Sequence, residues 1–275
     1  MRIYISADIE GIAGVVSREN LMPGRFEYEQ ARDWMTDAVL VACDTAFELG
    51  AKEIVISDSH GNGQNIRFER MPPGVQLVRS WPRPFGMMSG IETGHFDGAL
   101  LVGYHAGGSN PAGTLSHTLS GEFFHEVRIN GAVVSEMAIS AAIAGHFGVP
   151  VLLVAGDDVA VQEACEQLGD IATATLKYSN GWLSARTLSP ADAQALLRAG
   201  VKDGMARIGR ATPFVIGRPC TLEIRLRTRF VAEWLSYLDG VERTDAYSIR
   251  YQGADIAAIS RFLTFVGFAR AAVAA

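Results

Sequence analysis

Two acidic residues, Asp8 and Glu10, close the first apolar segment of the chain, in the sequence MRIYISADIEGIAG. If this segment is a β-strand, its period of two places both carboxylates on the same side. Carboxylates held this close repel each other, and one of them would bind a proton unless a cation lay between them. The pair therefore predicts either a solvated strand end or a metal site, and an isolated D-x-E pair is more often the former.

Histidines and acids follow the other predicted strands too. The segment ISDSHG places Asp58 and His60 after a second strand, and LLVGYH places His105 after a later one. His117 follows in the loop GTLSHTLSG, and Glu136 begins the helix after NGAVVS. Each has an ordinary structural explanation, since Asp58 could tighten its loop and Glu136 suits a helix N-terminus. Ligands of open parallel sheets bind beyond the carboxyl ends of the strands, so together these residues predict a site.

The strands and helices that must position these residues alternate through about residue 210. Apolar runs predict strands, and longer amphipathic stretches predict helices, the first of which is stopped by Gly50. The segment SGEFFHEVRINGAVV predicts a hairpin, because Asn-Gly suits a two-residue turn. The expected strands lie near residues 3–7, 53–58, 75–78, 98–105 and 150–155, and the expected helices near 28–49, 136–147 and 159–167. This order predicts an α/β fold with three layers around a largely parallel sheet.

The C-terminal part of the chain has a different pattern. CTLEIRLR and DAYSIRYQG alternate as strands with one solvated face, a helix is expected near residues 231–238, and a final helix begins near residue 255. We therefore predict an α/β catalytic domain over residues 1–210 and a smaller α+β lobe over residues 211–275.

The composition is that of a globular protein and argues against some classes of partner. Of the 275 residues, 48% are hydrophobic and 20% are charged. The formal net charge of -6 comes without long charged runs, so we expect no nucleic-acid surface and no basic patch for a membrane.

One uncharged stretch, MAISAAIAGHFGVPVLLVAG, is long enough to span a bilayer. Gly145, Gly148 and Pro150 interrupt it, which predicts a helix and then a buried strand.

Cysteine usage and the first residues of the chain predict a location. Cys43, Cys165 and Cys220 are far apart and odd in number, so they offer no disulfide or metal framework. We expect them to pack in the core of a protein from a reducing compartment. The first residues lack the apolar segment and cleavage site of a signal peptide. We therefore expect a cytoplasmic protein.

The motifs D-I-E-G, S-D-S-H-G, G-Y-H-A and L-S-H-T, with the glutamate after N-G-A-V-V-S, are specific as a set. In this order they resemble the DppA-type zinc D-aminopeptidases. The likeness runs over roughly residues 1–160 and includes VPVLLVAGDD, while the lysine of TLKYSNG is a weaker feature beyond it. The resemblance implies a zinc-dependent hydrolase that removes the N-terminal residue of short peptides, with D-amino acids of the D-Ala type as its substrates.

The same resemblance implies a centre with two zinc ions per subunit. Asp8 matches the carboxylate that bridges the two ions. Glu10 and His60 match the remaining ligands of one ion, and His105 and Glu136 match those of the other. Each ion then has three oxygen or nitrogen donors from the protein and an open position, which is typical of catalytic rather than structural zinc. On this interpretation Asp8 and Glu10 share a face because a metal pair needs them there.

His117 matches the catalytic histidine of the family. The family residue has been described as a nucleophile, but next to an activated water we favour a role in proton transfer or in stabilising the tetrahedral intermediate. The resemblance also implies a homo-oligomer, a decamer of two pentameric rings. The apolar C-terminal segment RFLTFVGFARAAVAA could form a subunit contact or simply part of the core.

Two other functions use similar residues. A dinuclear metallophosphoesterase would hold its metals with comparable ligands, but its usual D-x-H opening and later G-N-H-[DE] motif do not occur in this chain. A non-catalytic binding protein for small peptides or amino acids would leave the acids solvated. The stereochemical preference also stays open at this point, because the pocket walls that would select D-residues are not visible in sequence.

Overall fold

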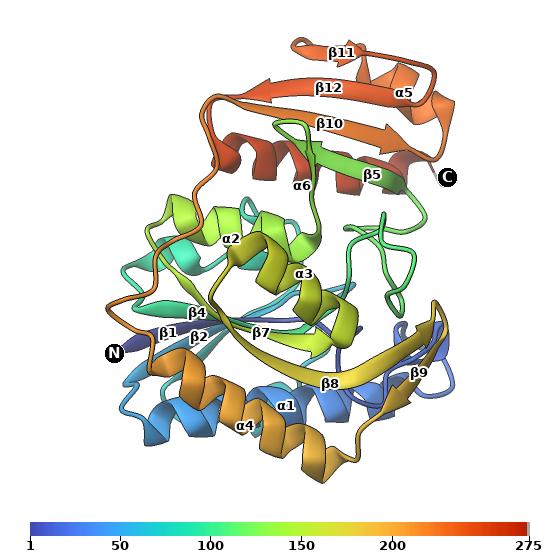
Figure 1. The fold of residues 1–275 in the computed structure, drawn as a ribbon. Helices are drawn as coiled ribbons and strands as arrows, with labels where there is room; N and C mark the ends of the chain where they lie inside the picture. Colours follow the sequence, from blue (N-terminus) through green and yellow to red (C-terminus); the bar gives the residue numbers. More distant parts are fainter. Residues whose placement is uncertain (274–275) are drawn as a thin grey trace.

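Seven strands form the main sheet of the protein (Figure 1). The computed structural model describes residues 1–273, with side chains through residue 268. The strands of this sheet are β1 (Arg2–Ala7), β2 (Glu53–Asp58), β3 (Val75–Val78), β4 (Gly98–Tyr104), β7 (Val151–Asp157), β8 (Ala172–Gly181) and β9 (Ser184–Thr187). Their order is β3-β2-β1-β4-β7-β8-β9, and every neighbouring pair is parallel except β8 and β9.

Helices cover both faces of this sheet, which confirms the predicted α/β architecture. One face carries α1 (Tyr28–Glu48) and α4 (Pro190–Met205), and the other carries α2 (Glu136–His146) and α3 (Asp158–Leu168) (Figure 1). Short 3-10 helices lie in the loops at η1 (Arg18–Asn20), η2 (Phe68–Arg70), η3 (Gly86–Met88) and η4 (Ile91–Thr93). Strand β4 is buried along its whole length, as expected for a strand between two helical layers.

The order in which the chain adds strands to the sheet reverses at β1. Strands β2 and β3 lie on one side of β1, whereas β4, β7 and β8 lie on the other. The chain that leaves β1 leads to α1 on one face of the sheet, whereas the chain that leaves β4 leads to the second sheet and then to α2 on the other face, and such a switch point is where open parallel sheets form a crevice. Open parallel sheets bind their ligands at this position. The topology thus selects the ends of β1 and β4 as the place for a site.

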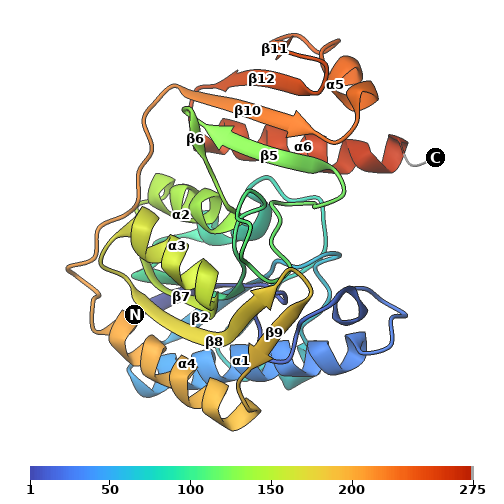
Figure 2. The ribbon, with the colours of Figure 1, turned by 45° about the vertical axis from the view of Figure 1, so that its right-hand side comes forward.

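A second, antiparallel sheet lies above the first (Figure 2). Its strands are β5 (Phe124–Ile129), β6 (Ala132–Val133), β10 (Cys220–Leu226), β11 (Val241–Arg243) and β12 (Ser248–Gly253), in the order β11-β12-β10-β5-β6. Helix α5 (Arg229–Leu235) contacts β10, β11 and β12, and helix α6 (Ile256–Val273) packs between this sheet and α2. These elements include the strands and helices predicted for the C-terminal part.

The predicted hairpin is present but belongs to the second sheet. Asn130 and Gly131 both have positive φ, 52° and 82°, as a type I′ turn requires. Strand β5 pairs with β10 in a register that places Ile129 opposite Leu222. The division of the chain at residue 210 stays a prediction, but residues 124–133 complete the sheet that it would assign to the C-terminal lobe. Nothing in the alternation of the hairpin itself indicates which sheet it joins.

The uncharged stretch from Met137 to Gly156 forms a helix and a buried strand, as predicted. Helix α2 ends at His146, Gly148 takes a positive φ of 74°, and β7 begins at Val151. Among the described residues, no helix combines the length and the apolar character that crossing a membrane would need.

The expectation that all cysteines are core residues is wrong for one of them. Cys43 and Cys220 are buried, but Cys165 is exposed. Helix α3 buries Ala160 and Ala164, and the next residue is rotated away from that face by the helical period.

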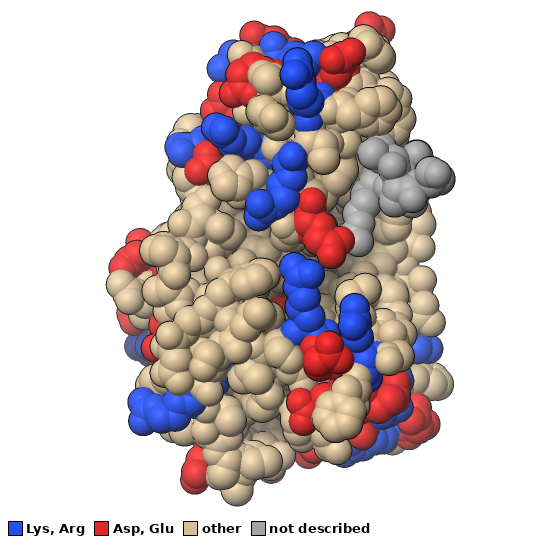
Figure 3. Space-filling model, turned by 90° about the vertical axis from the view of Figure 1, so that its right-hand side faces the viewer, with Lys and Arg blue, Asp and Glu red and all other residues tan. Residues whose placement is uncertain are grey.

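Surface charges of both signs are interspersed on the face of the molecule seen in Figure 3. Lys and Arg side chains lie beside Asp and Glu side chains there, over both the main sheet and the second sheet. This mixture agrees with a formal net charge of -6 that is spread along the chain.

Candidate metal centre

The loop after β1 carries Asp8 and Glu10 to the crevice. Strand β1 ends at Ala7, so the expectation that strand alternation aligns the two carboxylates is wrong. The backbone instead turns after Asp8, whose N–H still donates to Val102 O of β4 at 2.8 Å. Both side chains are nearly fully buried, with 3% exposure each. The turn, rather than the pleat, brings the two acids together.

Two glycines let this loop lie directly against β4. Gly11 N donates to Gly103 O at 2.7 Å, and a Cβ on Gly11 would stand only 2.0 Å from Tyr104 O. Gly103 has a φ of +77°, and a Cβ there would stand 2.1 Å from Asp8 O. A side chain at either position would push the loop away from the strand, so the glycine of D-I-E-G is a requirement of the site.

The loop after β2 delivers His60. Asp58 accepts hydrogen bonds from the N–H groups of Asn65 and Ile66, at 2.6 and 2.8 Å, and from Asn65 Nδ2 at 2.7 Å. Asn65 Nδ2 also donates to His60 O at 2.7 Å. Asp58 therefore tightens the loop, which is the structural role considered for it from sequence, and His60 alone enters the centre.

Asp8, Glu10 and His60 form the first of two groups that could hold a metal ion. His60 Nδ1 lies 2.8 Å from Glu10 Oε2 and 3.4 Å from Asp8 Oδ1. The other ring nitrogen, Nε2, donates to Leu21 O at 2.8 Å. This bond fixes the ring so that Nδ1 faces the two carboxylates.

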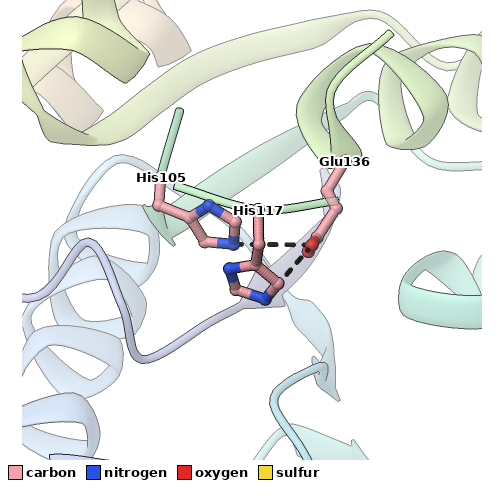
Figure 4. A group of neighbouring side chains, drawn as sticks. All are labelled: His105, His117 and Glu136. Carbon is pink, nitrogen blue, oxygen red and sulfur yellow. Dashed lines mark ion pairs between the residues drawn. The ribbon is translucent and has the colours of Figure 1, made fainter. Parts of the chain in front are cut away.

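His105, His117 and Glu136 form the second group. Figure 4 shows the two imidazole rings stacked, with both directed toward Glu136 at the start of α2. Their centroids are 4.1 Å apart, and Glu136 Oε1 lies 3.5 Å from His105 Nε2 and 3.6 Å from His117 Nε2. The side chain of His117 is 21% exposed, against 1% for His105. His117 is therefore the residue of the pair that approaching molecules can reach.

All three histidines donate one ring N–H to a backbone carbonyl. His105 Nδ1 donates to Ala106 O at 2.9 Å, and His117 Nδ1 donates to Leu115 O at 2.8 Å, as His60 Nε2 does to Leu21 O. Such bonds fix the tautomer and the orientation of metal-binding histidines. In each case the remaining nitrogen is presented to the carboxylates of the centre.

The loop that carries His117 is held in an unusual backbone conformation. Leu115 and Leu119, two residues before and after His117, have left-handed φ values of 56° and 62°. Leu115 N donates to Trp182 O at 2.7 Å, and Leu119 N donates to Glu136 Oε1 at 2.6 Å. Non-glycine residues take this conformation at a cost and often do so at functional sites.

Asp8 connects the two groups. Its Oδ1 faces His60 in the first group, while its Oδ2 lies 3.5 Å from His105 Nε2 in the second. Within the described part of the chain, Asp8 Oδ2 and His105 Nε2 are both buried without a hydrogen-bond partner. Two unpaired buried atoms that face each other fit a bound cation, and carboxylate oxygen with imidazole nitrogen is a donor set that zinc accepts. The residues present therefore fit the predicted metal site.

The buried carboxylates make this centre strongly negative. Burial, and then the charge of Glu10, raise the pKa of Asp8 to about 7. Burial alone would lower the pKa of both His60 and His105, but neighbouring carboxylates outweigh it and raise both values, that of His105 to about 10. The same site therefore favours positive charge, which a divalent cation would supply.

The pKa of His117 moves in the opposite direction. Burial, followed by the charge of the stacked His105, lowers it. His117 thus differs from the other two histidines in exposure and in the sign of its pKa shift.

Lys177 of β8 holds the backbone of the loop that carries Glu10, a role that was not predicted from the sequence. Its side chain is fully buried, and Nζ donates to Glu10 O and, at 2.5 Å, to Val15 O. Burial lowers the pKa of Lys177 to about 8, although Asp157 acts against this shift. A single charged residue inside an otherwise uncharged strand, in the segment TATLKY, was the signal available in sequence.

Most of the chain is similar to known D-aminopeptidases. Residues 1–265 match a family described as D-aminopeptidase. A D-aminopeptidase of Bacillus subtilis strain 168 is 33% identical over 257 residues, which cover 93% of each chain.

The fold is similar as well. The solved structure described as the zinc-dependent D-aminopeptidase DppA from Bacillus subtilis, a self-compartmentalizing protease, aligns with a TM-score of 0.91 and 30% identity. The alignment covers 97% of this chain and 96% of the other.

Replacing Lys177 tests its support of the Glu10 loop. Lys177→Met keeps the length of the side chain but leaves two buried carbonyls without their donor, which costs roughly 1–3 kcal/mol. We expect a lower melting temperature and a lower metal content, measured by calorimetry and elemental analysis. Lys52→Met, at an exposed lysine, is the matched control. If Lys177→Met matched the control in both measurements, the lysine would not support the centre.

Proposed function

The chain belongs to the D-aminopeptidase family, and from this we propose how its residues hold zinc and hydrolyse peptides. It is a zinc-dependent hydrolase that acts on peptide bonds. The observation that carries the proposal is the position of Asp8, whose two carboxylate oxygens each face a different group of metal-binding residues. A carboxylate in this position suits two ions held side by side.

We assign the ligands of two zinc ions per subunit as follows. Asp8 would hold both ions, Glu10 and His60 would complete the protein ligands of one, and His105 and Glu136 would complete those of the other. Each ion then has three protein donors, and substrate or water can take the open positions. Three carboxylates would balance three of the four positive charges, which leaves a net positive charge that would polarise a peptide carbonyl.

Zinc would supply the Lewis acid, and protein groups orient the residues around it. Bound zinc would act as a Lewis acid and lower the pKa of a coordinated water to around 7. Carbonyl groups of the backbone orient the three histidines, and Lys177 holds the loop that carries Glu10. The substrate is a short peptide with a free amino end and a D-residue in the first position.

We propose that His117 acts on the substrate and is not a zinc ligand. It could reach the second ion by distance alone, since it belongs to the same group as His105 and Glu136. Its greater exposure and its place on a loop beside the crevice favour contact with the reacting peptide. With Nδ1 bonded to Leu115 O, Nε2 is free to accept a proton and to return it to the leaving amine. The same nitrogen, when protonated, could stabilise the tetrahedral intermediate.

We further propose a cytoplasmic homo-oligomer, a decamer of two pentameric rings. The similar Bacillus subtilis enzyme is described as self-compartmentalizing, which a closed assembly would explain. Large apolar side chains lie exposed on the surface, among them Phe26, Phe68, Phe230 and Tyr237. Helix α6 buries Ile259 and Leu263 in the core but exposes Phe265, so both roles expected for the apolar C-terminal segment remain compatible with it. The side chains of residues 269–275 lie outside the described residues.

Metal content tests the bridging assignment. The purified protein should contain about two equivalents of zinc, measured by elemental analysis. Asp8→Ala should lose both, because its carboxylate serves both ions, whereas Glu10→Ala or His60→Ala should deplete mainly one. Asp44→Ala, at an exposed acid on α1, serves as the control. A fully loaded Asp8→Ala variant would contradict a bridging role for this carboxylate.

The role of His117 can be separated from that of the ligands. His117→Ala should keep its zinc and its melting temperature, while kcat falls by roughly 10²–10⁴-fold, as for other lost acid–base groups. His125→Ala, at an exposed histidine of β5, should behave as the unchanged protein. Zinc loss in His117→Ala would instead make this residue a ligand.

A substrate comparison tests the reaction class. D-Ala-D-Ala should be cleaved faster than L-Ala-L-Ala, and N-acetyl-D-Ala-D-Ala should resist because its amino end is blocked. A phosphodiester should not react, because the nearby buried cations Lys177 and Arg83 are occupied with protein oxygens, and Arg67 pairs with Asp33. Equal cleavage of free and acetylated peptides would contradict the aminopeptidase assignment. Turnover of the phosphodiester alone would point to a phosphoesterase.

A further inference from the structure

An apolar cavity of about 410 Å³ opens directly beside the metal centre. It is lined by Met87 of η3, by Ile139 and Ile143 of α2, and by Leu263 of α6. The cavity thus lies where the C-terminal helix α6 packs against α2 and η3. Its size falls within the range of about 300–1,000 Å³ that is usual for ligand pockets.

The cavity is continuous with the site. Glu136, a proposed zinc ligand, lines it, and so does Leu119, whose N–H donates to Glu136 Oε1. Ser59 and Gly61, the residues on either side of His60, line it as well. A peptide with its scissile carbonyl at the metal centre would therefore place a neighbouring side chain at the mouth of this cavity.

The walls of the cavity suit an apolar occupant. Among the described residues that line it, Glu136 is the only charged one. Some of its hydroxyl groups are already bonded to the protein, since Ser140 Oγ lies 3.1 Å from Tyr104 Oη and Thr264 Oγ1 donates to Arg83 O at 3.0 Å. A charged side chain placed here would lose its hydration without gaining a partner.

The volume also selects the size of the occupant. A water molecule takes about 30 Å³ of liquid volume, so the cavity has room for more than about ten such volumes. The methyl group of alanine would leave most of it empty, whereas a branched or aromatic side chain would remove far more apolar surface from water.

We propose that the preferred substrates carry a bulky apolar side chain, of the leucine or phenylalanine kind, on a residue that flanks the scissile bond. This proposal rests on the proposed function. This goes beyond the D-Ala preference implied by resemblance. Helix α6 sets the preference, because Ser260, Leu263, Thr264 and Gly267 line the cavity at the i, i+3, i+4 and i+7 positions of one helical face.

Gly267 offers a way to fill the cavity. A Cβ built on this residue meets no atom within 4 Å, so a larger side chain can enter the open space without a clash. Gly267→Leu should occupy the cavity, and Gly267→Ala adds only a methyl group. Arg261→Leu places the same leucine at an exposed position of α6 and is the matched control.

The experiment compares kcat/KM for D-Leu-D-Ala and D-Ala-D-Leu with that for D-Ala-D-Ala, using zinc-loaded protein. We expect at least one leucine peptide to exceed D-Ala-D-Ala by about ten-fold or more, and the position of the leucine identifies the residue that the cavity binds. Gly267→Leu should lower this ratio by about ten-fold or more, Gly267→Ala by less, and Arg261→Leu should leave it unchanged. Zinc content and melting temperature establish that each variant is folded.

Two outcomes separate this inference from the proposed function. If D-Ala-D-Ala is the best substrate and the ratios do not respond to Gly267→Leu, the cavity does not bind a substrate side chain, although the enzyme remains a D-aminopeptidase. If zinc-loaded protein cleaves none of the three peptides, the proposed function itself is overturned.

Discussion

Asp8, Glu10 and Glu136 place three carboxylates in the interior of the protein, where negative charge costs far more free energy than in water. Much of the site can be understood as a response to this charge. Histidines approach from the two loops that follow β2 and β4, the pKa values of His60 and His105 are raised, and a different carboxylate oxygen of Asp8 faces each candidate metal-binding group. Two divalent ions would relieve the repulsion and pair the atoms that otherwise lack a partner.

Buried carboxylates of this kind need a backbone that keeps their partners in fixed positions. The loop after β1 lies against β4 because Gly11 and Gly103 leave no side chain between them, and Lys177 holds the same loop from β8. Three carbonyl groups orient the imidazole rings. The left-handed residues around His117 fit this picture, because bonds to Trp182 and Glu136 hold their conformation. The site therefore depends on many groups outside the set of proposed metal ligands.

The second sheet contributes to the site through α6. Leu101 and Val154 of the main sheet belong to one hydrophobic core with Leu222 of the second sheet and Ile259 of α6. Packing of α6 between the second sheet and α2 places one face of the helix over the crevice and completes the apolar cavity beside Glu136. The proposed chemistry thus resides in the loops of the main sheet, while α6 forms a wall of the cavity next to them. Selectivity could change in such an arrangement without any change in the metal ligands.

The sequence by itself determined the α/β alternation, the Asn-Gly turn and the group of residues at the strand ends, because periodicity and turn chemistry are local properties. It could not determine that β5 joins the second sheet, since its pairing depends on a distant strand, β10. The alignment of Asp8 with Glu10 also came from a turn against β4, not from strand alternation. The buried role of Lys177 and the cavity under α6 were decided only by the tertiary structure, because both arise where segments far apart in the chain pack together.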